Sequence, residues 1–204
     1  MRFILSVSLL GIVPAIVALL FKERPATLGL SLKTPLLRKP WFWLLLPLAA
    51  GLGVLGALSP DLAAYYPYSR DLIRRVSATG FAPFVAHFTA YTFLYYLPWE
   101  FFFRGFLLLP LALEAERSSA NKESLVVNTV SSTVAALILF QTIPSTLLHF
   151  GHPLSELLSA VPAGIFFGIL AWKTKSIIPG FLLHAAIGFG TDLFIVLSQS
   201  GYLG

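Results

Sequence analysis

The sequence predicts an all-α protein, a single polytopic bundle of transmembrane helices with about six to seven spans. The chain has 204 residues, of which 57% are hydrophobic and 11% are charged, and its mean hydropathy is +0.82. Globular proteins carry roughly 25% charged residues, so this composition argues against a soluble class. Apolar runs of about 20 residues, enough to cross a bilayer, recur along the chain. They lack the alternation that a membrane β-barrel requires.

Six apolar segments predict the helices of the bundle. We expect them at residues 3–21, 41–58, 81–113, 125–149, 157–172 and 177–198. The first segment resembles a signal peptide, but no small-residue cleavage site follows it. The charged residues Lys22, Glu23 and Arg24 come directly after it, so we interpret it as an uncleaved span. The third run is longer than one crossing needs, and we keep open its division into two crossings at Pro98.

Charge and cysteine content limit the function classes. The net charge of +5 is explained by lysines and arginines in the connectors, as membrane topology requires. No basic stretch with interleaved aromatic residues indicates a nucleic-acid partner. The absence of cysteine excludes disulfides, thiolate metal sites and cysteine nucleophiles.

Glu100 and Arg104 place two charges inside the long third apolar run. Charged side chains at membrane depth are costly, so they usually face the protein interior or a water-filled cavity. A glutamate four residues before an arginine is the favourable order for an ion pair on one helix face. Two interpretations are open: a structural pair that locks helices together, or a functional carboxylate that Arg104 orients.

His149 and His152 lie at the end of the fourth apolar run. Two histidines three residues apart can ligate a metal or pass protons, although the HExxH zinc signature is absent. As interfacial residues they would have no such role. We favour His149 as the functional residue, because burial is what shifts a histidine pKa usefully and His152 lies in the loop before Pro153.

His184 lies in the last apolar run and shares a helix face with Gly188 and Asp192. The structural interpretation is an interhelical hydrogen bond, with Gly188 permitting close helix packing. A histidine and an aspartate on one inward face also suit a polar pocket. His87 stands alone in its apolar run, and we interpret it as a helix-contact residue rather than a ligand.

One glutamate, one arginine and two histidines from three separate segments can converge inside such a bundle. A carboxylate can deprotonate water, and an imidazole can assist it or stabilise an oxyanion. The set suits hydrolysis without a covalent nucleophile, and it suits a proton relay equally well.

The order of these motifs resembles a known family. The motifs are Glu100-x-x-Phe103-Arg104-Gly105, His149 at the end of an apolar helix, Phe167-Gly168, Lys175-Ser176-Ile177-Ile178-Pro179 and His184 in the last helix. They are similar to the CAAX protease and bacteriocin-processing family. Its members are intramembrane glutamic endopeptidases, also called abortive-infection proteins or type II CAAX prenyl endopeptidases. The resemblance covers roughly residues 80–198. We therefore divide the chain into N-terminal spans without family signal (residues 1–80) and a protease-like core (residues 81–204).

The resemblance also implies roles for residues. The family's Glu-Glu-x-x-x-Arg motif falls on Trp99, Glu100 and Arg104. Its Phe-x-x-x-His motif falls on Ser145 and His149, and its His-x-x-x-Asn or Asp motif falls on His184 and Gly188. In the family, the first glutamate and the second-motif histidine are thought to activate water. The last histidine and its asparagine are thought to stabilise the oxyanion.

This sequence departs from the family at two critical positions, Trp99 and Gly188, and Ser145 in place of phenylalanine is a smaller departure. An indole cannot act as a base, so Trp99 does not replace the first glutamate, and Gly188 offers no side-chain donor. We expect Glu100 to activate water with His149, Arg104 to orient Glu100 and His184 to stabilise the oxyanion. Asp192 or His152 is expected to support this set. The alternative is a catalytically inactive relative that binds a membrane peptide or partner protein.

The resemblance implies no cofactor. Its expected partners are membrane lipids and membrane-presented peptides or protein tails, with or without a lipid modification, and the expected location is a bacterial inner (plasma) membrane. Two further classes stay open. One is a proton-linked carrier, against which the lack of an internal repeat argues mildly. The other is a zinc hydrolase that uses His149, His152 and His184.

Overall fold

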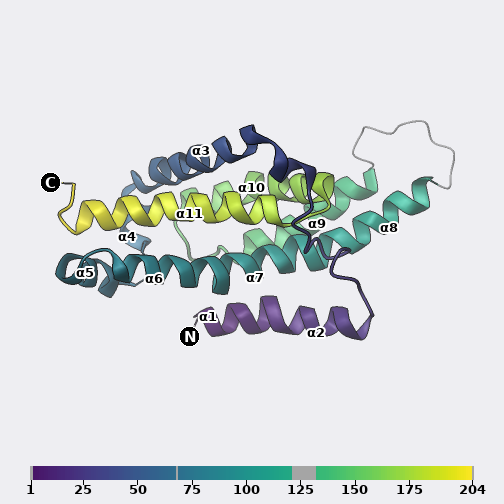
Figure 1. Cartoon of the computed structure of the whole chain (residues 1–204), viewed down its shortest axis with the longest axis horizontal. Helices are drawn as coiled ribbons and strands as arrows, with labels where there is room; N and C mark the ends of the chain where they lie inside the picture. The colour runs from purple at the N-terminus through teal and green to yellow at the C-terminus, as the bar shows by residue number, and fades with distance from the viewer. Residues whose placement is uncertain (1, 68, 121–131, 204) are drawn as a thin grey trace.

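The protein is a bundle of helices, as the computed structural model of residues 2–67, 69–120 and 132–203 shows (Figure 1). The helices are α1 (Arg2–Leu5), α2 (Val13–Leu20), α3 (Pro40–Ala57), α4 (Pro60–Tyr65), α5 (Arg70–Thr79), α6 (Ala82–Tyr91), α7 (Leu97–Glu100), α8 (Leu109–Ala120), α9 (Ser132–Leu147), α10 (Leu154–Thr174) and α11 (Ile178–Gln199). The π-helical stretches η1 (Ser6–Ile12), η3 (Thr92–Tyr96) and η4 (Phe101–Leu108) join helices end to end, and η2 (Pro35–Arg38) is a 3₁₀ turn. Within the described residues every regular element is helical, which confirms the predicted fold class.

Five helices in the described part of the chain are long and apolar enough to cross a membrane. They are Phe3–Leu20, Pro40–Ala57, Ala82–Ser118, Leu154–Thr174 and Ile178–Gln199. The apolar helix α9 is shorter, with 16 residues, and the start of the predicted segment 125–149 lies outside the described residues. Together these helices make the chain an integral membrane protein. Many large apolar side chains are exposed on their outer faces, as expected where a helix meets lipid.

The long third run is one continuous helix from Ala82 to Ser118, and Pro98 does not divide it. A proline inside a helix lacks an N–H, and its ring collides with the carbonyl four residues earlier. The π-helical stretch η3 ends just before α7, the short helix that holds Pro98. A wider π turn relieves such a clash, and membrane helices tolerate proline through local adjustments of this kind.

The same long helix forms the centre of the bundle. In its most apolar window 56% of the residues are buried, against 17% for the first span. The first span lies along one side of it, and α11 lies between it and α3 (Figure 1). The helices α4 and α5 lie between the second and third predicted apolar segments. This arrangement turns the polar residues of the third run and of α11 toward the protein interior.

Two glycines let α3 and α11 pack backbone against backbone. A Cβ added at Gly53 would lie 2.0 Å from the carbonyl oxygen of Ile187, and one at Gly190 would lie 1.9 Å from that of Ala50. The hydroxyl of Thr191 donates to the carbonyl of Gly53 at 3.1 Å. Close approach through small residues is the usual way in which membrane helices associate. The pair therefore holds α11 at the position from which its polar residues reach the interior.

We expect Gly53→Ala to destabilise the protein by about 1–3 kcal/mol, the usual cost of overpacking. Gly51→Ala on the same helix is the matched control, because a Cβ at Gly51 meets nothing within 4 Å. Both changes gain the same intrinsic helix propensity, so their difference isolates the clash. Thermal unfolding in detergent micelles measures it, and equal midpoints for the two variants would contradict the proposed packing role of Gly53.

Candidate active site

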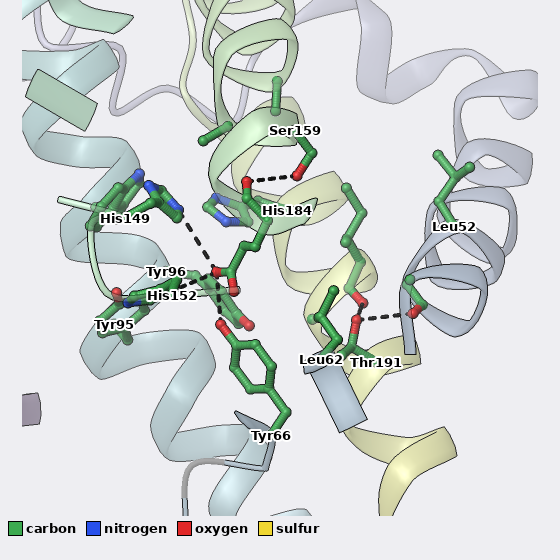
Figure 2. A pocket seen from close by; sticks show the side chains of 18 of the residues that line it. Leu52, Leu62, Tyr66, Tyr95, Tyr96, His149, His152, Ser159, His184 and Thr191 are labelled. Atoms are coloured by element: carbon green, nitrogen blue, oxygen red, sulfur yellow. Dashed lines mark hydrogen bonds and ion pairs between the residues drawn. The ribbon is translucent and has the colours of Figure 1, made fainter. Parts of the chain in front are cut away.

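A cavity of about 460 Å³ lies among α3, α7, α10 and α11 and gathers most of the predicted site residues (Figure 2). The predicted residues in its lining are Trp99, Arg104, His149, His152, His184, Gly188 and Asp192. Glu100 is not in this lining and is fully buried behind it. The residues that reach the cavity thus come from the third run, the turn after α9 and the last helix.

Glu100 and Arg104 form the predicted ion pair, and His184 completes it. One Arg104 guanidinium nitrogen donates to Glu100 Oε1 at 3.2 Å, and His184 Nδ1 lies 2.8 Å from the same oxygen. Because a carboxylate only accepts, Nδ1 carries the proton, and Nε2 is left to face the cavity. Both members of the ion pair are almost completely buried, at 0% and 2% exposure. Glu100 therefore holds His184 in place and is linked to the cavity through its two partners, His184 and Arg104.

His149 is held in a similar way at the turn after α9. Its Nδ1 lies 2.8 Å from the carbonyl oxygen of Ser145, which fixes the proton on Nδ1 and leaves the Nε2 lone pair free in the neutral ring. Burial lowers the pKa of His149 below its ordinary value of 6.5, and the Ser145 bond opposes this only partly. The ring is therefore neutral at pH 7 and able to accept a proton. The indole of Trp99 packs edge-on against it, with centroids 5.2 Å apart.

Glu156 is a site residue that sequence reasoning missed. It lies in the first turn of α10, and its Oε1 accepts from the Tyr66 hydroxyl at 2.8 Å and from His152 Nδ1 at 3.0 Å. His149 Nε2 is 3.9 Å from the same oxygen. Figure 2 shows Tyr66, His149 and His152 converging on this point of the cavity. Sequence reasoning missed Glu156 because it lies between a predicted loop and a predicted span. The one signal that could have found it is its i,i+4 spacing from His152.

Asp192 lines the cavity, and its partner is a histidine of another helix. Its Oδ2 lies 3.3 Å from His87 Nε2, whereas His184 binds Glu100. His87 is thus a helix-contact residue, as predicted, and its contact is polar.

At Gly188 the missing side chain is replaced by a neighbouring phenol. A Cβ at this position would lie 1.9 Å from the hydroxyl oxygen of Tyr96. The Tyr96 ring also packs on His184, with centroids 4.8 Å apart. A hydroxyl therefore occupies the place beside His184 where a side chain at position 188 would lie.

In the part of the chain that the structure describes, the histidines do not form a metal-binding group with carboxylates. Within the described residues, no three His, Cys, Asp or Glu side chains are arranged so that they could hold a metal ion. Of the three histidines that we considered as zinc ligands, His184 binds Glu100 and His152 binds Glu156.

Comparison with known proteins identifies the family. Residues 80–190, more than half of the chain, match the family described as type II CAAX prenyl endopeptidase Rce1-like. Comparisons with curated proteins and with solved structures give no significant match. The matched region contains both charges of the buried ion pair and the cavity histidines His149, His152 and His184. The chain belongs to the Rce1-like family of type II CAAX prenyl endopeptidases.

Proposed function

We propose that the protein is an intramembrane endopeptidase that cleaves membrane-presented peptides or protein tails with water activated in the cavity. One observation carries the proposal: His149 and His184, from different parts of the chain, line the same cavity. Each ring is anchored through Nδ1, by Ser145 and by Glu100 respectively. Peptide hydrolysis without a covalent nucleophile needs one group that accepts a proton from water and one that donates to the oxyanion. Two pre-oriented imidazoles can fill these two roles.

We propose that proton abstraction from water takes place on the side of the cavity where His149 lies. Its ring is neutral at pH 7, and its Nε2 can accept the proton as the water oxygen attacks the scissile carbonyl carbon. The carbonyl oxygen then carries the negative charge of a tetrahedral intermediate. Collapse of that intermediate returns the proton to the leaving nitrogen, so one water is consumed for each bond cleaved.

We assign oxyanion stabilisation to His184 and Tyr96. His184 donates to the oxyanion when its Nε2 carries a proton, and Glu100 then balances the charge of the ring through Nδ1. Tyr96 supplies a hydroxyl beside it, at the place where Gly188 has no side chain. In this assignment Glu100 is a positioning residue for His184 rather than the base, and Arg104 keeps the carboxylate charged in the protein interior.

The cavity walls indicate the substrate class. Its lining is largely apolar, with Leu52, Leu62 and Phe167 beside tyrosines and Trp99. Such walls suit an extended apolar peptide segment or a lipid-modified tail, and the mechanism requires no cofactor. In a bacterial inner membrane, the location that we propose, peptides of this kind are presented from within the lipid.

A second candidate is a catalytically inactive relative that binds a peptide or partner protein. The observation that favours it is that Trp99 stands in the cavity lining at the position of the family's first glutamate. An indole supplies packing surface but no base.

Proteolysis by the purified protein in lipid vesicles tests these two functions. The substrates are membrane-anchored peptides with and without a prenylated C-terminal cysteine, and mass spectrometry detects new peptide termini. We expect cleavage by the unaltered protein and none by His149→Ala, which removes the proton acceptor. The control is His87→Asn, which changes a histidine outside the cavity lining and keeps a donor for Asp192. Recovery of crosslinked, uncleaved peptide without any product would favour the inactive relative.

A further inference from the structure

Glu156 is the carboxylate closest to the proton-accepting side of the cavity. Two donors hold its Oε1, the Tyr66 hydroxyl and His152 Nδ1. Its Oε2 is buried, and no donor of the described residues reaches it. A buried carboxylate oxygen without a donor is costly, and here it belongs to a residue of the cavity lining.

The other carboxylates near the cavity have different tasks. Glu100 lies outside the lining and binds Arg104 and His184. Asp192 lies beside His87, on the last helix. Among the acidic residues that the structure describes in this lining, Glu156 is the one whose carboxylate lies near His149, with Oε1 3.9 Å from Nε2.

We propose that Glu156 is a catalytic residue that abstracts the proton from the attacking water together with His149. This inference rests on the proposed function and supplies the carboxylate that Trp99 cannot. The water oxygen bonds to the scissile carbonyl carbon, and its proton passes to the carboxylate of Glu156 or, through it, to His149. When the C–N bond breaks, the same proton goes to the leaving nitrogen, so the carboxylate is unchanged after each turnover.

Tyr66 and His152 position this carboxylate. Burial, reinforced by the nearby Glu156 charge, raises the pKa of Tyr66 well above its ordinary value of 10.0. The phenol therefore stays protonated and donates a hydrogen bond to Glu156. Both donors bind Oε1, and Oε2 has no donor among the described residues. Tyr66 follows α4 and lies outside the residues that match the family, so the N-terminal part of the chain helps to build the site.

The competing explanation is a structural clasp, in which Glu156 only ties α10 to the segment after α4. A clasp has two ends, so removing either end should have the same effect. A catalytic carboxylate is different, because Tyr66→Phe removes one hydrogen bond but keeps the base, whereas Glu156→Gln removes the base.

The test compares Glu156→Gln, Tyr66→Phe and the unaltered protein in the vesicle assay for peptide cleavage. We expect Glu156→Gln to lower kcat/KM at least a hundredfold, as the loss of a general base usually does. Tyr66→Phe should lower it about tenfold or less. Glu114→Gln, which changes an exposed glutamate on α8, is the control and should cleave at the original rate.

The following results would overturn the assignment. If Glu156→Gln cleaves within threefold of the unaltered protein, or if the two site variants lose activity equally, Glu156 is not the base and the proposed function stands. If Glu156→Gln unfolds, Glu156→Ala replaces it, and a rate within threefold of the unaltered protein in that variant also ends the assignment. Absence of cleavage by the unaltered protein would instead overturn the proposed function, and this inference with it.

Discussion

Replacing Glu100 by glutamine is expected to cost the protein both stability and cleavage. The change removes the negative charge that faces the Arg104 guanidinium at 3.2 Å, inside the bundle. An arginine that is only 2% exposed then has no counter-charge. Breaking a buried pair by removing one partner typically costs about 3–5 kcal/mol, because the remaining charge is left uncompensated. We therefore expect a large fall in the free energy of unfolding.

Peptide cleavage by Glu100→Gln should also fall, because His184 loses the carboxylate that holds its Nδ1. An amide can still accept from Nδ1, but it cannot stabilise a doubly protonated ring as a carboxylate does. Product formation in the vesicle assay should fall below detection even below the unfolding temperature of the variant.

A double-mutant cycle separates the two effects. Glu100→Gln combined with Arg104→Met removes both charges, and such a replacement is often close to neutral for stability. The double variant should thus recover most of the lost stability but none of the cleavage. Full stability and full activity of Glu100→Gln alone would show that neither the ion pair nor the His184 contact matters.

The helical bundle could be predicted because a lipid bilayer leaves few alternatives. Every backbone polar group must find its partner within the span, so a long apolar run becomes a helix. The Glu100–Arg104 contact was equally accessible, since residues four apart on a helix are neighbours. Pro98 showed the limit of such local rules, because a π-helical stretch absorbed a residue that would break an isolated helix.

Contacts between different helices could not be predicted from the sequence in the same way. Tyr66 and Glu156 are 90 residues apart, and their hydrogen bond depends on how the segment after α4 packs against α10. The pairing of Asp192 with His87 likewise depends on the crossing of α6 and α11. The sequence raised the convergence of His149 and His184 as a possibility, and the family resemblance gave them roles in one site. The cavity that both line follows from the packing of helices, which hydropathy does not encode.

The Tyr96 hydroxyl lies where a side chain at position 188 would be, and this leads to the second large prediction. We expect Tyr96→Phe to lower kcat about 10²–10³-fold with little loss of stability, the usual effect of losing one oxyanion donor. Tyr202→Phe, which removes the hydroxyl of an exposed tyrosine near the C-terminus, is the matched control and should cleave normally. A Tyr96→Phe variant that cleaves at the original rate would remove Tyr96 from the oxyanion site.

The reciprocal change tests whether position 188 and Tyr96 compete for one place. Gly188→Asn restores the family's amide but puts its Cβ 1.9 Å from the Tyr96 hydroxyl and 2.5 Å from the ring carbon that bears it. We expect the single variant to lose about 1–3 kcal/mol of stability through overpacking, and to lose cleavage as Tyr96 is displaced. Tyr96→Ala combined with Gly188→Asn makes room for the amide beside His184. That double variant should cleave at least tenfold faster than Tyr96→Ala alone, because a donor is again present where the oxyanion forms. Equal rates would mean that the two positions do not serve one function.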